Sequence, residues 1–217
     1  KIFSGQYGAE ISALMLSKEK LVHSSLWGGD LEAFIFQGSA RGLFRKKDVL
    51  FSVADTSVYR LGKKAPFGSI LGARGPYGIF AAGVDTPLNN WFRKVYIDRY
   101  SVPPVGGSYQ AAQGVLAAKY AYDAAAKANG GKFPNKDQVI AALEGATYQG
   151  IAAPVHMNRS NGHQAATKHM IGVLQWDKEA GEPIMTKVTE FGPDCVMPPP
   201  GVNGTEWLKG GMKGAKC

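Results

Sequence analysis

Long hydrophobic runs are missing from this sequence of 217 residues. A membrane-spanning helix needs about eighteen or more consecutive apolar residues, and no stretch approaches that length, so we expect no direct membrane insertion. A secretory leader is missing too, because residues 1–5 contain neither a start methionine nor a charged segment followed by an apolar one. We therefore expect that a segment upstream of Lys1 has been removed, as a signal peptide would be, or lies outside this sequence.

Cysteine is scarce, with Cys195 and Cys217 both close to the carboxyl end. Their spacing fits no zinc pattern and no pair of histidines lies at ligand spacing nearby, so we expect no metal site. A disulfide between them would close a loop of about 20 residues, contribute on the order of 3 kcal/mol and indicate an oxidising compartment. Two free thiols in a cytosolic protein are the alternative.

Motifs for covalent catalysis and for nucleotide binding are also missing. There is no G-x-S-x-G elbow, and neither cysteine has a histidine partner in context. Residues 62–64 lack the earlier glycine and the Ser or Thr of a phosphate loop, and residues 72–78 lack the G-x-G start of a dinucleotide fingerprint. The four histidines are isolated from one another (His23, His156, His163 and His169). The sequence predicts a protein that is not an enzyme and needs no cofactor; an α/β enzyme with its catalytic groups in another part of the protein is the alternative.

The net charge of +8 raises the question of nucleic-acid binding. The basic residues are scattered along the chain, and they form no helical face interleaved with aromatic side chains, which a nucleic-acid surface would need. We therefore expect a solvated basic surface and no nucleic-acid partner.

The first third of the chain alternates strand-like and helix-like patterns. An apolar run from Leu21 stops at Gly28-Gly29, after which Asp30 is a good N-cap for a helix with Leu31, Phe34 and Ile35 on one face. Residues 49–53 form a continuously apolar run, typical of a parallel strand buried on both faces, and residues 69–73 predict another strand. Strands alternating with helices indicate an α/β fold.

Helical patterns follow, and then strand patterns. Thr86-Pro87 is a strong helix start, Ser108 is expected to cap a helix that runs to about Ala128, and Asn135 with Gln138 predicts a capping box. Residues 154–158, 169–176 and 185–190 then alternate with period 2, and the tail from Phe191 looks irregular. This order suggests more than one lobe, with chain crossings near Gly75-Pro76 and between residues 158 and 167.

Two side chains follow predicted strands at the edge where ligands gather in open α/β sheets. Trp27 follows the first strand, where it either covers a ligand or fills a gap between two helices. Asp55 follows the next strand, where it either holds an ammonium group or caps the following turn.

Several segments, taken in order, resemble type I periplasmic substrate-binding proteins of the branched-chain amino acid group, which serve ABC importers. The matching segments are Gly8–Leu14, Leu21–Phe34, Gln37–Leu43, Tyr109–Ala112, Val139–Glu144, Asn161–Ala165 and Gly172–Trp176. Their order and spacing, rather than any single motif, carry the resemblance from Gly5 to about Phe191.

The resemblance implies two Rossmann-like lobes with ligand held in the cleft between them. On that pattern residues 1–75 belong to the second lobe, 76–165 to the first lobe and 166–190 again to the second, and 191–217 form an irregular tail. The expected fold is incomplete at its N-terminal side, because most of the first lobe has no counterpart in this sequence.

The resemblance also implies a function and a set of binding residues. The family's acid that pairs with a ligand ammonium matches Asp55, and the aromatic that closes over the ligand matches Trp27. We expect Ser25, Gly28 and Thr56 beside them, and Tyr77 beside the crossing, to line the same site. Asp55 is shorter than the glutamate of some relatives, and Gly28 stands where others carry a second aromatic, which leaves the ligand's side chain open.

The expected function is the binding of a small amino-acid-like ligand, branched-chain or related, by hinge closure, with an ABC transporter permease as partner and a periplasmic location. Binding of an aromatic acid, an amide or urea by the same fold is the alternative, as is the ligand-sensing domain of a regulator.

Overall fold

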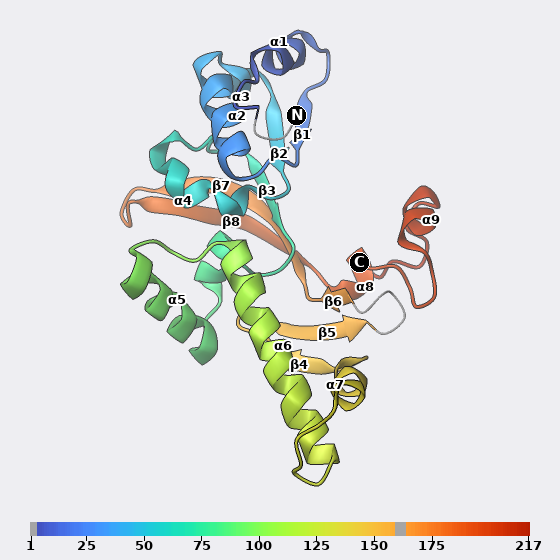
Figure 1. The fold of residues 1–217 in the computed structure, drawn as a ribbon. Helices are drawn as coiled ribbons and strands as arrows, with labels where there is room; N and C mark the ends of the chain where they lie inside the picture. Colours follow the sequence, from blue (N-terminus) through green and yellow to red (C-terminus); the bar gives the residue numbers. More distant parts are fainter. Residues whose placement is uncertain (1–3, 159–163) are drawn as a thin grey trace.

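A computed structural model describes residues 4–158 and 164–217 as two β-sheets with helices around them (Figure 1). The larger sheet has the order β1-β2-β3-β7-β8 and the smaller one the order β4-β5-β6. Their strands are β1 (Leu21–Ser24), β2 (Asp48–Phe51), β3 (Ile70–Ala73), β4 (Thr147–Gln149), β5 (Pro154–Asn158), β6 (Gln164–Ala166), β7 (His169–Asp177) and β8 (Glu182–Phe191). The α/β class predicted from the alternating patterns is confirmed.

Most of the helices lie between the strands in the chain. The α-helices are α1 (Gly8–Leu16), α2 (Gly28–Ala40), α3 (Leu43–Lys46), α4 (Val58–Leu61), α5 (Pro87–Tyr100), α6 (Gly106–Ala128), α7 (Lys136–Leu143), α8 (Pro193–Val196) and α9 (Gly204–Lys209). Three 3₁₀ segments in the described part join these elements, namely η1 (Ala54–Thr56), η2 (Gly62–Lys64) and η3 (Gly78–Gly83).

The direction of the strands decides where the loops gather. Strands β1, β2 and β3 are parallel, so their carboxyl ends lie at one edge of the larger sheet. Strand β7 runs antiparallel to β3, with Met170 opposite Ala73, so β7 begins at that same edge. The loops after β1, β2 and β3 and the start of β7 therefore meet in one place.

The core of the larger sheet lies on one of its faces. Ile11 of α1, Leu31 of α2 and Leu43 of α3 are fully buried against Val49 and Phe51 of β2. The expectation that residues 49–53 are buried on both faces is wrong, because Leu50 and Ser52 are only half-buried. Side chains alternate between the faces of a strand, and helices α1–α3 cover the one to which Val49 and Phe51 point.

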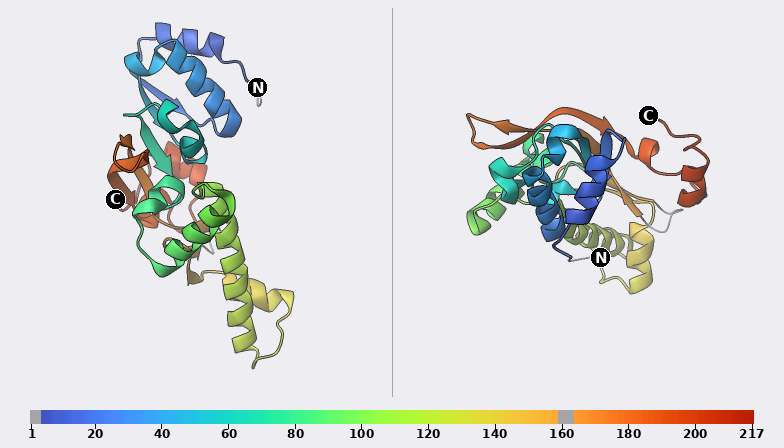
Figure 2. Two further views of the ribbon diagram at one scale, coloured as in Figure 1. Left: turned by 90° about the vertical axis from the view of Figure 1, so that its left-hand side faces the viewer. Right: turned by 90° about the horizontal axis from the view of Figure 1, so that it is seen from above.

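Helix α6 carries the second part of the molecule away from the larger sheet, as the left view of Figure 2 shows. It packs beside α7 and against β4 and β5, where Tyr148 and Val155 are buried. The predicted capping box of α7 is confirmed, with Asn135 accepting from Gln138 N and Gln138 accepting from Asn135 N. The start of α5 is also as predicted, because Thr86 caps it and Pro87 is its first residue.

Helix α6 begins two residues before the predicted cap, at Gly106 rather than after Ser108. The Ser108 hydroxyl instead donates to Tyr96 Oη at 3.1 Å. Since the first N–H of the helix binds a carboxylate from the other part of the molecule, described below, the helix does not depend on a local serine cap.

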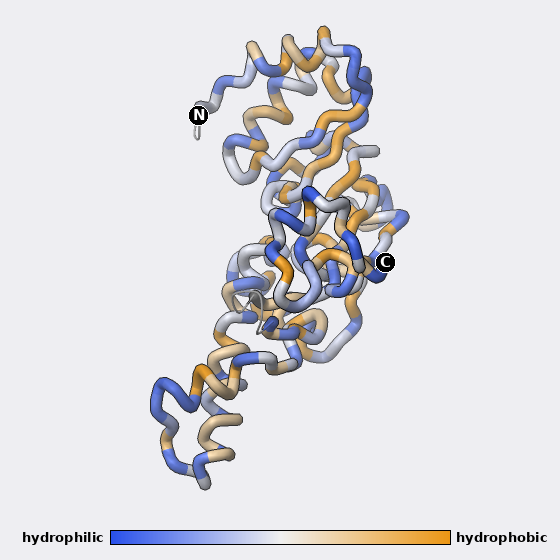
Figure 3. Tube along the Cα trace, turned by 90° about the vertical axis from the view of Figure 1, so that its right-hand side faces the viewer, coloured by the Kyte–Doolittle hydropathy of each residue, from blue (hydrophilic) through white to orange (hydrophobic). Residues whose placement is uncertain are grey.

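The tail after Phe191 contains the short helices α8 and α9, so it is less irregular than expected. A disulfide joins Cys195 to Cys217, and Trp207 Nε1 donates to Lys213 O at 2.8 Å. The tail therefore closes on itself through both a covalent and a polar contact. Figure 3 shows that hydrophobic residues concentrate in the strands of the larger sheet, whereas the turn between α6 and α7 is mostly hydrophilic.

Candidate functional site

A cleft of about 530 Å³ lies where the loops after β1, β2 and β3 face the start of α6. Most of its lining follows the carboxyl ends of those strands, and the rest comes from the first turns of α6 and the segment between β3 and η3. The lining residues are Ser25, Trp27, Ser52, Val53, Asp55, Thr56, Ala73, Arg74, Tyr77, Gly106, Gly107 and Gln110. Five of the predicted binding residues, Ser25, Trp27, Asp55, Thr56 and Tyr77, are thus brought together.

Trp27 stands at the rim of the cleft, with 60% of its surface exposed. Within residues 4–158 and 164–217, Trp27 therefore does not fill a gap between two helices. Trp27 is the N-cap residue of α2, and Gly28 begins the helix with φ +57°, in the left-handed region that favours glycine. The expected capping role of Asp30 is therefore wrong; Asp30 lies in the first turn, where an acidic side chain favours the helix dipole.

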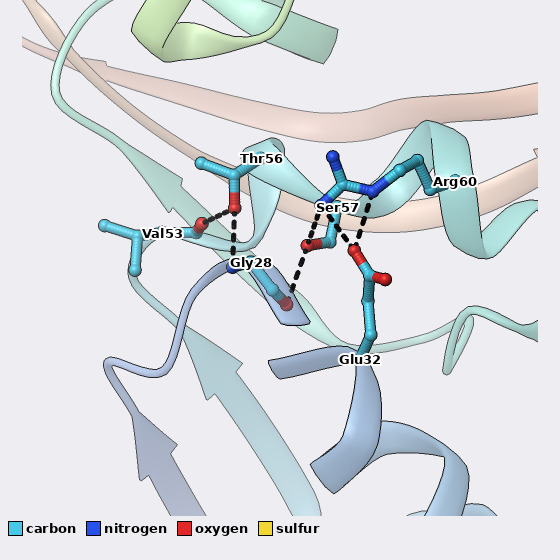
Figure 4. A network of polar contacts seen from close by, with 6 residues as sticks. All are labelled: Gly28, Glu32, Val53, Thr56, Ser57 and Arg60. Carbon is cyan, nitrogen blue, oxygen red and sulfur yellow. Dashed lines mark hydrogen bonds and ion pairs between the residues drawn. The ribbon is translucent and has the colours of Figure 1, made fainter. Parts of the chain in front are cut away.

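A polar network ties the Trp27 turn to the segment that carries Asp55 (Figure 4). Gly28 N donates to Thr56 Oγ1 at 3.4 Å, and that hydroxyl donates to Val53 O at 3.1 Å. Ser57 Oγ donates to Gly28 O at 3.4 Å. Gly28, which does not line the cleft, therefore acts by holding the tip of β1 against η1.

Arg60 and Glu32 extend this network toward solvent. Arg60 Nε donates to Glu32 Oε1 at 2.8 Å, which joins α4 to α2 (Figure 4). Both helices follow the ends of strands that border the cleft, so the ion pair helps to hold these two strand ends at a fixed distance from each other.

Asp55 lies at the bottom of the cleft and is only 7% exposed. Its Oδ2 accepts a hydrogen bond of 2.9 Å from Gly106 N, the first N–H of α6. A carboxylate at a helix N-terminus is favoured by the helix dipole and by an otherwise unpaired N–H group. Asp55 therefore joins the larger sheet to α6 across 51 residues of sequence.

Two glycines make room for the Asp55 carboxylate. A Cβ atom on Gly106 would lie 2.1 Å from Asp55 Oδ2, and one on Gly78 would lie 3.0 Å from the same oxygen. Gly78 also has φ +56°. The close approach of α6 to η1 thus depends on the missing side chain at Gly106 above all.

Burial raises the pKa of Asp55 from 3.8 to about 6, while the hydrogen bond from Gly106 and the positive charge of Arg74 act in the opposite direction. Desolvation dominates because the carboxylate has lost most of its contact with water. At neutral pH the group is mostly ionised, and it becomes protonated in mildly acidic solution.

Tyr77 forms a rigid wall of the cleft. It is 4% exposed, its ring stacks on Tyr109 with centroids 5.8 Å apart, and its hydroxyl accepts from Gln113 Nε2 at 2.8 Å. The chain reaches it through Gly75, where φ is +152° and a Cβ would lie 2.2 Å from the Tyr77 ring. The position of Tyr77, between β3 and η3, is therefore set by α6 on one side and by Gly75 on the other.

Sequence reasoning missed five polar or backbone groups of the cleft, namely Ser52, Arg74, Gly106, Gly107 and Gln110. Arg74 follows β3 as Asp55 follows β2, so its place after a predicted strand was the available signal. Gly106-Gly107 precedes the long helix in the sequence, but nothing local indicates that Asp55 approaches it.

No group of three metal-ligating side chains is found within residues 4–158 and 164–217. His169 lies beside Arg74, and burial together with that positive charge lowers its pKa. His163 lies outside the described residues. Among the helices of the same two ranges, none combines the length and the apolar character needed to cross a membrane.

A model of the periplasmic binding protein family matches residues 4–182, which include every strand that borders the cleft. The chain belongs to this family. The type I resemblance drawn from the sequence is therefore confirmed. No curated protein matches the chain.

Solved structures of solute-binding proteins share the fold of this type I periplasmic binding protein. One is the solute binding protein of an ABC transporter from Rhodopseudomonas palustris BisB5 in complex with 3,4-dihydroxybenzoic acid, with a TM-score of 0.70 and 18% identity over 87% of this chain and 49% of that one. Another is the leucine-, isoleucine-, valine-, threonine- and alanine-binding protein of Brucella ovis in its closed conformation, with a TM-score of 0.64 and 17% identity over 92% of this chain and 48% of that one. The chain thus spans about half the length of these proteins.

Proposed function

We propose that this chain is part of the substrate-binding component of an ABC importer, which holds a small solute in the cleft and delivers it to a membrane permease. The observation that carries the proposal is the cleft itself. It has a volume of about 530 Å³ and lies between the ends of three parallel strands and the start of α6. That volume is in the usual range for small-molecule sites. The family and the fold support the proposal, and the Cys195–Cys217 disulfide supports a periplasmic location, because disulfides persist in oxidising compartments.

The proposed mechanism is hinge closure without catalysis. A solute that contacts both sides of the cleft binds the closed form more tightly than the open form and so shifts the population toward it. Trp27, at the exposed rim, would cover the apolar part of the solute, and Tyr77 would form the opposite wall. Ser25 and Thr56 would supply hydroxyl groups, while Gly28 positions Thr56.

Two classes of ligand fit this proposal. An amino-acid-like ligand would place its ammonium group on Asp55. The Asp55 carboxylate would then accept hydrogen bonds from both the ammonium group and Gly106 N. An aromatic acid, an amide or urea would not need that contact. The relatives named above include a protein bound to a dihydroxybenzoate and a protein that binds aliphatic amino acids, so the fold accommodates both classes.

Thermal denaturation of the full-length protein with a panel of amino acids, aromatic acids and amides tests the proposal. A ligand present at 100 times its dissociation constant should stabilise the protein by about 2.7 kcal/mol. Trp27→Ala should weaken that ligand about tenfold, because a stacked aromatic contact is lost. Trp91→Ala is the matched control, since Trp91 is 59% exposed on α5 and does not line the cleft. Failure of the whole panel to shift the melting temperature would contradict the proposal.

A further inference from the structure

The cleft is lined by two charged residues in the part of the chain that the structure describes, Asp55 and Arg74. They differ in what they already contact. Asp55 is buried and its Oδ2 is engaged by the first N–H of α6. Arg74 is exposed to solvent, immediately after the carboxyl end of β3.

Arg74 has neither a hydrogen bond nor an ion pair among residues 4–158 and 164–217. Its charge nevertheless acts on two neighbours: it opposes the burial that raises the pKa of Asp55, and it adds to the burial that lowers the pKa of His169. A guanidinium group presents five N–H donors in a planar fork that matches a carboxylate. Arg74 therefore offers a solute in the cleft a positive charge and N–H donors that no described residue already binds.

Arg74 also stands where two hollows meet. It lines the cleft together with Tyr77 and Gln110, and the same three residues line a second hollow of about 430 Å³ that continues toward Tyr148 and His169. A solute in the cleft can therefore reach Arg74 with one end while its other end lies near Trp27 at the rim. The lining of the cleft also includes the apolar Val53 and Ala73.

We propose that the solute is a small carboxylic acid whose carboxylate pairs with Arg74 and whose apolar, preferably aromatic, part lies under Trp27. This inference rests on the proposed solute-binding function and specifies its ligand class. It assigns to Arg74 the choice between charged and neutral solutes. On this inference Asp55 positions α6 through its hydrogen bond from Gly106 N and does not bind a ligand ammonium group.

The test compares benzoate, benzamide and leucine by isothermal titration calorimetry on the full-length protein. Benzoate and benzamide have nearly the same shape and differ in charge, so their affinity ratio reports the contact with Arg74. We expect wild-type protein to bind benzoate at least tenfold more tightly than benzamide. Arg74→Gln should weaken benzoate about tenfold to a hundredfold, the usual range for losing a charge-assisted hydrogen bond, and leave benzamide unchanged.

Arg99→Gln is the matched control, because Arg99 lies in the last turn of α5 and does not line the cleft. Its benzoate affinity should equal that of wild type. An equal loss of benzoate and benzamide in Arg74→Gln would assign Arg74 a merely structural role and overturn the inference.

The remaining outcomes separate the inference from the function on which it rests. Binding of leucine that is lost in Asp55→Asn and unchanged in Arg74→Gln would overturn the inference while supporting the solute-binding function. Binding of none of the three compounds would overturn the carboxylic-acid assignment, and the wider panel described above would then decide whether the solute-binding function also fails.

Discussion

The contact between Asp55 and Gly106 is the most consequential single-residue feature of the cleft. It places a buried carboxylate on the first N–H of α6, and a Cβ at Gly106 would lie 2.1 Å from Asp55 Oδ2. The neighbouring Gly107 would have nothing within 4 Å of an added Cβ. The two glycines therefore have different roles although they are adjacent in sequence and both lie in the first turn of α6.

Gly106→Ala is expected to destabilise the protein by about 1–3 kcal/mol, because the added methyl group must displace either the carboxylate or the helix. Gly107→Ala should be neutral or stabilising by up to about 1 kcal/mol, because alanine favours the helix. Urea denaturation of the two variants beside wild type measures both values. Equal effects of the two substitutions would contradict the assigned role of Gly106.

The raised pKa of Asp55 predicts a pH dependence of stability. Its pKa rises from 3.8 in the unfolded chain to about 6 in the folded protein, so the folded state binds more protons between these values. The contribution to the free energy of unfolding is therefore fully present below about pH 4 and is lost as the pH rises through about 6, a difference on the order of 3 kcal/mol.

Asp55→Asn should remove this component, since asparagine has no proton to lose and its side-chain oxygen can still accept from Gly106. We expect the variant to match wild type near pH 4 and to exceed it in stability near pH 8. Urea denaturation at a series of pH values checks this expectation. Parallel pH profiles for the two proteins would show that Asp55 does not titrate as assigned.

At the scale of single elements, local sequence signals account well for the helix starts in the second part of the molecule. Helix α7 begins with a complete capping box, in which Asn135 Oδ1 accepts from Gln138 N at 3.0 Å. Helix α5 begins with Thr86 and Pro87. Both motifs depend on residues within four positions of each other, so the sequence predicted them correctly.

Asn135→Ala is expected to cost about 1 kcal/mol, because the N–H of Gln138 loses its acceptor. Lys132→Ala, at an exposed position before the helix, is the control and should change stability by less than about 0.5 kcal/mol. Chemical denaturation distinguishes the two. A loss as large in the control as in Asn135→Ala would mean that the cap contributes nothing specific.

At the scale of the whole molecule, the start of α6 contacts the loop after β2 of the larger sheet, the middle of α6 packs against the smaller sheet, and the tail is closed by a covalent bond. The disulfide joins positions 22 residues apart, Cys195 and Cys217, and Lys216 N donates to Asp194 O at 3.0 Å beside it. The tail is therefore held by a covalent bond as well as by backbone hydrogen bonds.

Cys217→Ser is expected to destabilise the tail by about 3 kcal/mol, because the open chain regains the conformational freedom that the closed loop removes. Limited proteolysis with mass spectrometry should detect new cleavage between residues 197 and 216, while the sheets stay intact. Dithiothreitol should give wild type the same cleavage pattern and should not change that of the variant. Unchanged protection of the tail in the variant would contradict this expectation.

The sequence by itself determined the order of strands and helices, the caps of α5 and α7, and the candidates Trp27 and Asp55, because each depends on residues close together in the chain. Only the tertiary structure decided what these candidates contact. Asp55 binds an N–H group 51 residues away, and Arg74 enters the cleft because β3 lies parallel to β2. It also decided that Trp27, rather than Asp30, is the N-cap residue of the helix after β1. Such contacts follow from how the two parts of the molecule pack, and packing across long sequence distances leaves no periodic or local signal.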